Sequence, residues 1–190
     1  MVVLNEFSIC NNFKTDCKGK GEFAENDFIN YFYSNSNNKG KKLFDVREIK
    51  EYQDIDVDFI IDNNGNCSTL PDFNTVLYNK DQFLKIEVKY NSPAIKTGKF
   101  AFEMISHSNF GWGFKTKCDY IYVVFGKEEP KGIFNVLKRG IIDFEKWKDF
   151  ISDRNNYREI YFNKDENIIV NIMTYLKDMK NKKVLNYITQ

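Results

Sequence analysis

The sequence is poor in the residues that many metal and catalytic sites require. His107 is the single histidine of the 190 residues, which excludes zinc sites built on histidine pairs and acid–base chemistry shared between two histidines. The four cysteines are scattered without a Cys-x-x-Cys pair, so neither a zinc cage nor a disulfide framework is indicated. Any bound metal would therefore be held mainly by oxygen.

Long hydrophobic runs and an excess of charge are also missing. No stretch approaches the roughly 18 apolar residues of a membrane span, and the first residues, MVVLNEFSICNNFK, lack the pattern of a signal peptide. We therefore expect a cytoplasmic protein without a membrane partner, and the abundance of Asn and Lys is typical of an AT-rich bacterial or phage genome. A net charge of +1 gives no general attraction to nucleic acid but permits local basic patches.

The apolar content is that of one folded domain. Hydrophobic residues make up 42% of the chain and aromatic residues 16%, which suffices for a sizeable core. Because there is no repeat, linker or compositional break, we predict a single domain over residues 1–190. Its core would cover roughly residues 20–125, with a C-terminal elaboration over residues 126–190.

Hydrophobic periodicity predicts a helix followed by several strands. EFAENDFINYFYSN, at residues 22–35, has helical spacing and is followed by turn residues. DIDVDFIID (54–62) alternates as a strand does, and FLKIEVKY (83–90) reads as a buried strand that is interrupted by Glu87 and Lys89. DYIYVVF (119–125) is apolar on both faces, which is typical of a central strand.

Two later segments have helical periods. They are IDFEKWKDFI (142–151) and DENIIVNIMTYLKDM (165–179), the second with Asp165 as its cap. A helix, several strands and then helices predict an α/β fold in which helices flank a central mixed sheet.

The strand FLKIEVKY carries the first candidate site. Glu87 and Lys89 are two residues apart, so their side chains project from the same face of the strand. The triplet Glu-x-Lys occurs three times in the chain, so the spacing alone indicates little. An acidic strand precedes this copy, and if the two strands are neighbours, Asp58 and Glu87 converge.

Two converging carboxylates repel each other, and a divalent cation with oxygen ligands relieves the repulsion. Mg²⁺ is the usual cation in phosphate chemistry, where it stabilises charge on phosphate oxygens. Lys89 would then orient or activate the attacking water and offset the developing charge. The alternative is that these residues form only the solvated faces of two strands, joined by ion pairs worth roughly 0.2–1 kcal/mol each.

Four segments occur in an order that carries a family resemblance. They are GEFAEN, YQDIDVDFII, KIEVK and TGKFAFEMISHSNFGWGFKTKCDYIYVVF. Together they resemble the PD-(D/E)XK nuclease superfamily, the restriction-endonuclease-like fold that includes Holliday-junction resolvases, over roughly residues 20–125. The resemblance implies a restriction-endonuclease-like core with a central mixed sheet flanked by helices.

The resemblance also implies the roles of individual residues. Asp58 and Glu87 correspond to the metal ligands, with the Val88 carbonyl as a third, and Lys89 corresponds to the catalytic lysine. Glu25 corresponds to the helix glutamate that some members use for a second metal or its water.

Several assignments have rivals within the sequence. Glu22 competes with Glu25 for the helix position. Asp72, in the literal dipeptide Pro71-Asp72, competes with Asp58, because a hairpin between NTVLY and FLKIEVKY would place it opposite Lys89. Asp56 is either a ligand or a solvated neighbour of Asp58.

Further residues are candidates for contact with the substrate. Gln53 would bond to a phosphate, brace the site or have only a surface role. Trp112 is more typical of packing than of base stacking. Lysines in the loops around the site would hold phosphates; they are Lys96, Lys99, Lys115 and Lys117.

The sequence thus predicts a deoxyribonuclease that uses Mg²⁺ or Mn²⁺ and acts on DNA. Cleavage of both strands by one site per chain would favour a homodimer. The alternative is a catalytically inactive module of the same fold that binds nucleic acid or a protein partner.

Overall fold

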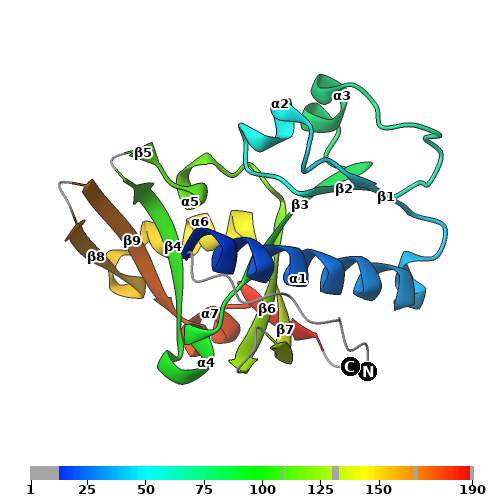
Figure 1. Cartoon of the computed structure of the whole chain (residues 1–190). Coiled ribbons are helices and arrows are strands. Elements are labelled where there is room, and N and C mark those ends of the chain that lie inside the picture. The colour runs from blue at the N-terminus through cyan, green and yellow to red at the C-terminus, as the bar shows by residue number, and fades with distance from the viewer. Residues whose placement is uncertain (1–12, 108, 130–132, 165–166, 189–190) are drawn as a thin grey trace.

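A six-stranded mixed sheet lies at the centre of the protein (Figure 1), in a computed structural model that describes residues 13–107, 109–129, 133–164 and 167–188. All neighbouring strands are antiparallel except β3 and β6, which are parallel. The predicted α/β architecture with a central mixed sheet is therefore confirmed. In spatial order the strands are β1 (Lys42–Asp45), β2 (Phe59–Asp62), β3 (Phe83–Tyr90), β6 (Tyr120–Glu129), β7 (Ile133–Asp143) and β10 (Leu185–Ile188).

A second, four-stranded antiparallel sheet was not predicted. Part of it comes from the crossover between the parallel strands β3 and β6, and the rest comes from the C-terminal region. Figure 1 shows it beside the central sheet. In spatial order its strands are β5 (Asn109–Phe110), β4 (Lys99–Ser106), β9 (Asn167–Tyr175) and β8 (Tyr157–Lys164).

The helix predicted over residues 165–179 is wrong for most of its length. Residues 167–175 form β9, and the helix that follows is confined to α7 (Leu176–Asn181). The segment is rich in Ile, Val and Thr, which favour strands, and it pairs with β4 on one side and β8 on the other. Asp165, its expected cap, lies outside the described residues.

The remaining helices are short except for the first. The predicted helix over residues 142–151 is confirmed as α6 (Phe144–Ser152), where the Asp143 carboxylate accepts a hydrogen bond from the Lys146 amide at 3.1 Å. None of the helices in the described ranges is long and apolar enough to cross a membrane. The other helices are α1 (Phe13–Ser34), α2 (Lys50–Gln53), α3 (Phe73–Tyr78), α4 (Pro93–Thr97) and α5 (Trp112–Lys115), with 3-10 turns at Ser36–Asn38 and Arg154–Asn156.

Helix α1 covers one face of the central sheet. Ala24, Phe28 and Phe32 are buried at a spacing of four residues, so they form one stripe of the helix. The Phe28 ring lies 5.1 Å from that of Phe59 and 5.0 Å from that of Tyr122, centroid to centroid. The first predicted helix is therefore confirmed, and it ends directly before the predicted turn residues.

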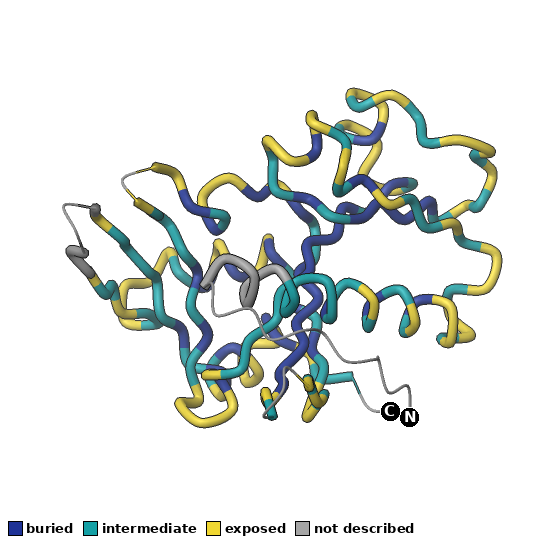
Figure 2. Tube along the Cα trace, viewed as in Figure 1, coloured by how far each residue is buried: buried dark blue, intermediate teal, exposed yellow. Residues whose placement is uncertain are grey.

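The opposite face of the sheet packs against the second sheet and the C-terminal helices. Phe102 of β4 stacks on Trp147 of α6 with 3.9 Å between ring centroids, and both side chains are buried. The buried cluster on this face includes residues as far apart in the chain as Val46 and Leu185. The buried parts of the chain follow the central strands (Figure 2).

Strands β3 and β6 are the buried pair at the middle of the sheet. Strand β3 spans the predicted residues 83–90, and β6 begins within the predicted segment 119–125. Lys85 of β3 is 1% exposed, and both its amide and its Nζ donate to Asp119 Oδ2 at 2.8 Å. This ion pair fixes the beginning of β6 against β3.

Replacing Asp119 by Asn should destabilise the protein strongly. The change leaves the Lys85 ammonium buried without its counter-ion, which costs about 3–5 kcal/mol in the free energy of unfolding. Urea denaturation measures the loss. Glu129→Gln, which breaks the exposed Lys127–Glu129 pair, is the matched control and should cost less than about 1 kcal/mol; equal losses would contradict the assignment.

Candidate functional site

The acidic segment before β2 is a turn rather than the start of a strand. Residues 54–56 form the turn, and Asp56 has a φ of 53°, a region that residues with a Cβ rarely adopt. The Thr116 hydroxyl donates to the Asp56 carbonyl at 2.9 Å, and the Lys117 amide donates to the Ile55 carbonyl at 3.0 Å. The predicted strand over residues 54–62 is therefore wrong in its first half, because the turn interrupts the alternation.

Asp58 follows this turn and lies beside β3. Its amide donates to the Ile86 carbonyl at 3.0 Å, and its Oδ2 accepts from the Val88 amide at 2.8 Å. In the antiparallel β2–β3 pair Phe59 lies opposite Ile86, which brings Asp58 next to Glu87. The strands are thus neighbours, as the convergence of the two carboxylates required.

Glu87 is the buried acid of the site. Its side chain is 2% exposed and forms an ion pair with the Lys89 ammonium, whereas its Oε2 has no hydrogen-bond partner. Burial raises the pKa of Glu87 well above its usual range, and Asp58 and Asp56 add to this effect against the attraction of Lys89. One carboxylate oxygen of Glu87 is therefore left for a cationic or proton-donating ligand.

Lys89 is enclosed by carboxylates and one aromatic ring. Its Nζ pairs with Glu87, lies 4.0 Å from Asp56 Oδ2, and lies 4.8 Å from the centroid of the Trp112 ring. Burial lowers the pKa of Lys89, but Glu87, Asp56 and Asp58 outweigh it and raise the pKa above its ordinary value. Lys89 is therefore an ammonium at neutral pH, which can donate hydrogen bonds and offset negative charge.

Asp58 has a pKa above its ordinary value. Burial raises the pKa of Asp58 to about 6, although Lys89 and the hydrogen bond from the Val88 amide lower it; Glu25 and Asp56 raise it further. The fold thus holds the carboxylates of Asp56, Asp58 and Glu87 close together although they repel each other, and Lys89 is their counter-ion.

Glu25 of α1 is held by an arginine that was not among the predicted site residues. Arg47 forms ion pairs with Glu25 and with Asp45, and its guanidinium lies 5.1 Å from the centroid of the Phe59 ring. The pKa of Asp58 responds to Glu25, which places this glutamate in the electrostatic environment of the site. Arg47 thereby ties α1 to the beginning of β2.

Gln53 braces the same region. Its side-chain amide donates a hydrogen bond to the Arg47 carbonyl. The Gln53 side chain is exposed and holds the backbone at Arg47, which matches a bracing role for this loop.

Asp72 does not lie opposite Lys89 as the hairpin alternative required. NTVLY is part of helix α3 rather than a strand, and Asp72 is the cap of that helix. The Asp72 carboxylate accepts from the Thr75 amide at 3.0 Å and from the Thr75 hydroxyl at 2.5 Å, and these bonds lower its pKa. Asp58 is therefore the aspartate that the fold brings to Glu87.

The four candidate lysines do not gather at one place. Lys115 and Lys117 are exposed beside α5 and the turn at Asp56. Lys96 lies in α4, and Lys99 lies at the start of β4 with its Nζ 5.1 Å from the Tyr175 ring. Figure 1 shows α4 and α5 at opposite ends of β4, so the expected single cluster is wrong and one pair of lysines borders the site.

Trp112 forms a wall between the site and the apolar core. Its ring lies 5.4 Å from that of Phe102, while its face meets Lys89. A Cβ on Gly111 would stand 2.3 Å from the Glu103 carbonyl oxygen, so glycine permits the close approach that positions Trp112. The expected packing role of Trp112 thus includes contact with the lysine.

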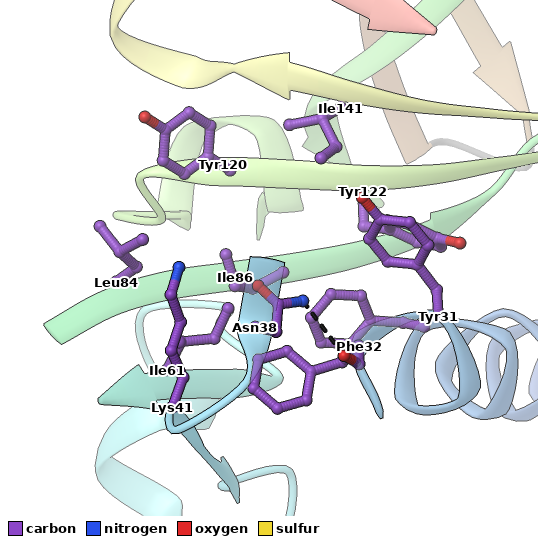
Figure 3. Close-up of a pocket in the computed structure, with 11 residues that line it drawn as sticks. Tyr31, Phe32, Asn38, Lys41, Ile61, Leu84, Ile86, Tyr120, Tyr122 and Ile141 are labelled. Atoms are coloured by element: carbon purple, nitrogen blue, oxygen red, sulfur yellow. Dashed lines mark hydrogen bonds between the residues drawn. The ribbon is translucent and has the colours of Figure 1, made fainter. Parts of the chain in front are cut away.

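A separate apolar cavity lies on the other side of the sheet. Its volume is about 260 Å³, and Phe28, Phe32, Ile86 and Tyr122 are among its lining residues (Figure 3). Within the lining, the Asn38 amide donates to the Phe32 carbonyl at 3.1 Å. Because side chains alternate along β3, Ile86 faces this cavity and Glu87 faces away from it; the cavity is not part of the acidic site.

No protein-family model matches the chain, and no match was found among curated proteins or solved structures. Within the described residues, His, Cys, Asp and Glu form no group of three or more that could hold a metal ion. A cation at Asp58 and Glu87 would therefore need further oxygen ligands from the backbone, water or substrate.

Asp58→Asn should stabilise the metal-free protein at neutral pH. The folded-state pKa of Asp58, about 6, exceeds the ordinary 3.8, so folding favours the protonated form and ionisation costs stability as pH rises from about 4 to about 6. The uncharged Asn should raise the free energy of unfolding at pH 7 by up to about 3 kcal/mol, and by little at pH 4.

Urea denaturation in EDTA at both pH values tests this expectation. Asp72→Asn is the control. Because the pKa of Asp72 is lowered, removing its charge should not raise the free energy of unfolding at pH 7. An Asp58→Asn protein no more stable than wild type at pH 7 would contradict the electrostatic account.

Trp112 and Lys89 should be energetically coupled. A cation–π contact at this distance contributes about 0.5–2 kcal/mol, so a double-mutant cycle of Trp112→Leu and Lys89→Met should show a coupling of that size in the free energy of unfolding. The matched cycle pairs Trp112→Leu with Lys115→Met, where the lysine is exposed on the same short helix. Equal coupling in both cycles would exclude a specific Trp112–Lys89 contact.

Proposed function

We propose that the protein is a divalent-metal-dependent deoxyribonuclease of the restriction-endonuclease-like fold. The observation that carries the proposal is the placement of Asp58, Glu87 and Lys89 around one point, with the Oε2 of the buried Glu87 left without a partner. A buried carboxylate oxygen in that state is costly, and a site that binds a cation compensates for the cost.

The arrangement of the central sheet supports the same class. A helix precedes the strands, β2 follows the candidate aspartate, antiparallel β3 carries Glu-x-Lys, and a crossover returns to β6, parallel to β3. This is the order in which the sequence motifs resemble the nuclease superfamily.

The residues present fit a hard divalent cation such as Mg²⁺ or Mn²⁺. The donors are carboxylate oxygens, and Glu87 Oε2 and Asp56 Oδ2 are both buried without a hydrogen-bond partner. Asp58, Glu87 and the Val88 carbonyl would hold the ion, and Glu25 would take the part of the helix glutamate that some members of the superfamily use for a second ion or its water. When bound, such an ion supplies positive charge to a phosphate oxygen and makes water more acidic.

The side chains of this chain have distinct tasks in the proposed hydrolysis of a DNA phosphodiester. Lys89, held as an ammonium, donates to the phosphate and offsets the negative charge that develops on it. Trp112 and Glu87 restrict where that ammonium lies. Arg47 holds Glu25 and the start of β2 in position, and the lysines beside α5 would contact the DNA backbone.

A catalytically inactive module that binds nucleic acid or a protein is the second candidate. The Glu87–Lys89 ion pair favours it, because the lysine already neutralises the buried acid without a metal. The absence of a three-ligand group among the described residues points the same way. A cleavage assay separates the two candidates.

Plasmid and single-stranded DNA should be cut in Mg²⁺ or Mn²⁺ and left intact in EDTA. Asp58→Asn, Glu87→Gln and Lys89→Met should each lower the cleavage rate by at least about 100-fold, because each removes a group that stabilises the reacting phosphate or its cation. Gel electrophoresis of timed digests gives the rates, and circular dichroism verifies that the variants fold.

Asp72→Asn is the matched control and should cleave like wild type, since Asp72 caps α3. Equal cleavage by wild type and the three site variants would exclude the proposed site. Binding of DNA without cleavage in either cation would favour the inactive module.

A further inference from the structure

Two phenylalanine side chains are exposed to solvent beside the candidate site. Phe110 of β5 is 60% exposed and Phe114 of α5 is 57% exposed, yet their rings stack on each other at 4.3 Å with an angle of 8° between the planes. Large apolar groups exposed in this way typically mark an interaction surface. Because the two rings are stacked in parallel, each keeps its outer face open, and we call this stacked pair the aromatic platform.

The segment that carries the two phenylalanines is anchored at both ends. Gly111, between the two rings in sequence, packs against the Glu103 carbonyl and donates its amide to the Met104 carbonyl at 2.9 Å. The buried Thr116 bonds to the turn at Asp56. Both ends of the segment are therefore anchored to the second sheet or to the site, and little conformational entropy would be lost when a ligand stacks on it.

The platform adjoins the proposed reaction centre and carries positive charge. Trp112, whose ring lies over Lys89, belongs to the same four-residue helix as Phe114, and Thr116, directly after this helix, bonds to the turn at Asp56. Exposed Lys115 and Lys117 follow Phe114 directly. Aromatic surface next to lysines is the composition with which proteins bind single-stranded nucleic acid, by stacking bases and pairing with phosphates.

We propose that Phe110 and Phe114 form a stacking platform for an unpaired base of the DNA that the site acts on. The bases of a continuous duplex are stacked inside it, so a platform of this kind selects single-stranded or branched DNA. This inference rests on the proposed nuclease function, because it names the substrate class of the same site.

Binding in EDTA tests the platform without any cleavage. Fluorescence anisotropy would compare a labelled single strand, a forked duplex and a continuous duplex of matched sequence. The double variant Phe110→Leu/Phe114→Leu keeps an apolar surface but removes the stacking rings, and stacking contributes about 1–3 kcal/mol per base. Its affinity for the single strand and the fork should fall at least about 5-fold, with duplex affinity unchanged.

Two control proteins define the specificity of that effect. Tyr78→Leu removes a ring that is 81% exposed on α3, away from β5 and α5 in Figure 1, and should bind all three DNAs like wild type. Lys115→Gln/Lys117→Gln should weaken binding to all three and reduce the dependence of affinity on salt.

An equal loss on the single strand, fork and duplex, or no loss on any, would overturn the platform. Monomerisation of a wild-type dimer by the phenylalanine changes, with DNA affinity unaltered, would also overturn it and assign the patch to self-association. Cleavage by wild type without phenylalanine-dependent binding refutes the platform alone. Phenylalanine-dependent binding without cleavage in Mg²⁺ or Mn²⁺ refutes the nuclease proposal and leaves the unpaired-base platform standing.

Discussion

The burial of the Glu87 carboxylate in the middle of β3 is the constraint around which the site is built. A charged group at this depth requires compensation, and Lys89 provides it from the same face of the strand. Lys89 is in turn confined by Asp56 and the Trp112 ring. The left-handed turn at Asp56 and the close approach at Gly111 are thus both linked to the one buried acid.

The carboxylates come from two parts of the fold. Strand β3 supplies Glu87, and the segment before β2 supplies Asp58 and Asp56. The second sheet positions Trp112 beside Lys89, since Gly111 and Trp112 pack against β4 at its bulge. Burial is the main cause of the raised pKa values of Asp58 and Glu87, and the neighbouring carboxylates add to it; such raised values are typical of functional sites.

Local patterns were sufficient to predict the elements whose burial is one-sided or complete. The apolar stripe of α1 and the fully apolar DYIYVVF appear as predicted, and FLKIEVKY forms the predicted strand. Its polar residues Lys85 and Glu87 are buried, however, rather than part of a solvated face. The segment at residues 165–179 was misassigned because Ile and Met repeat at spacings that suit a helix, whereas pairing with β4 and β8 makes most of it a strand. The role of Arg47 was not predicted. The only signal in the sequence was that arginine is rare, since most of the 28 basic residues are lysine.

The sequence by itself determined that Glu87 and Lys89 share a face of one strand, because side chains alternate along any strand. It also limited a possible metal site to oxygen ligands, through its scarcity of histidine and paired cysteine. Only the tertiary structure decided between Asp58 and Asp72, separated Lys96 and Lys99 from Lys115 and Lys117, and brought Trp112 to Lys89. These are contacts between residues far apart in the chain, and they depend on strand pairing and packing that no local pattern encodes.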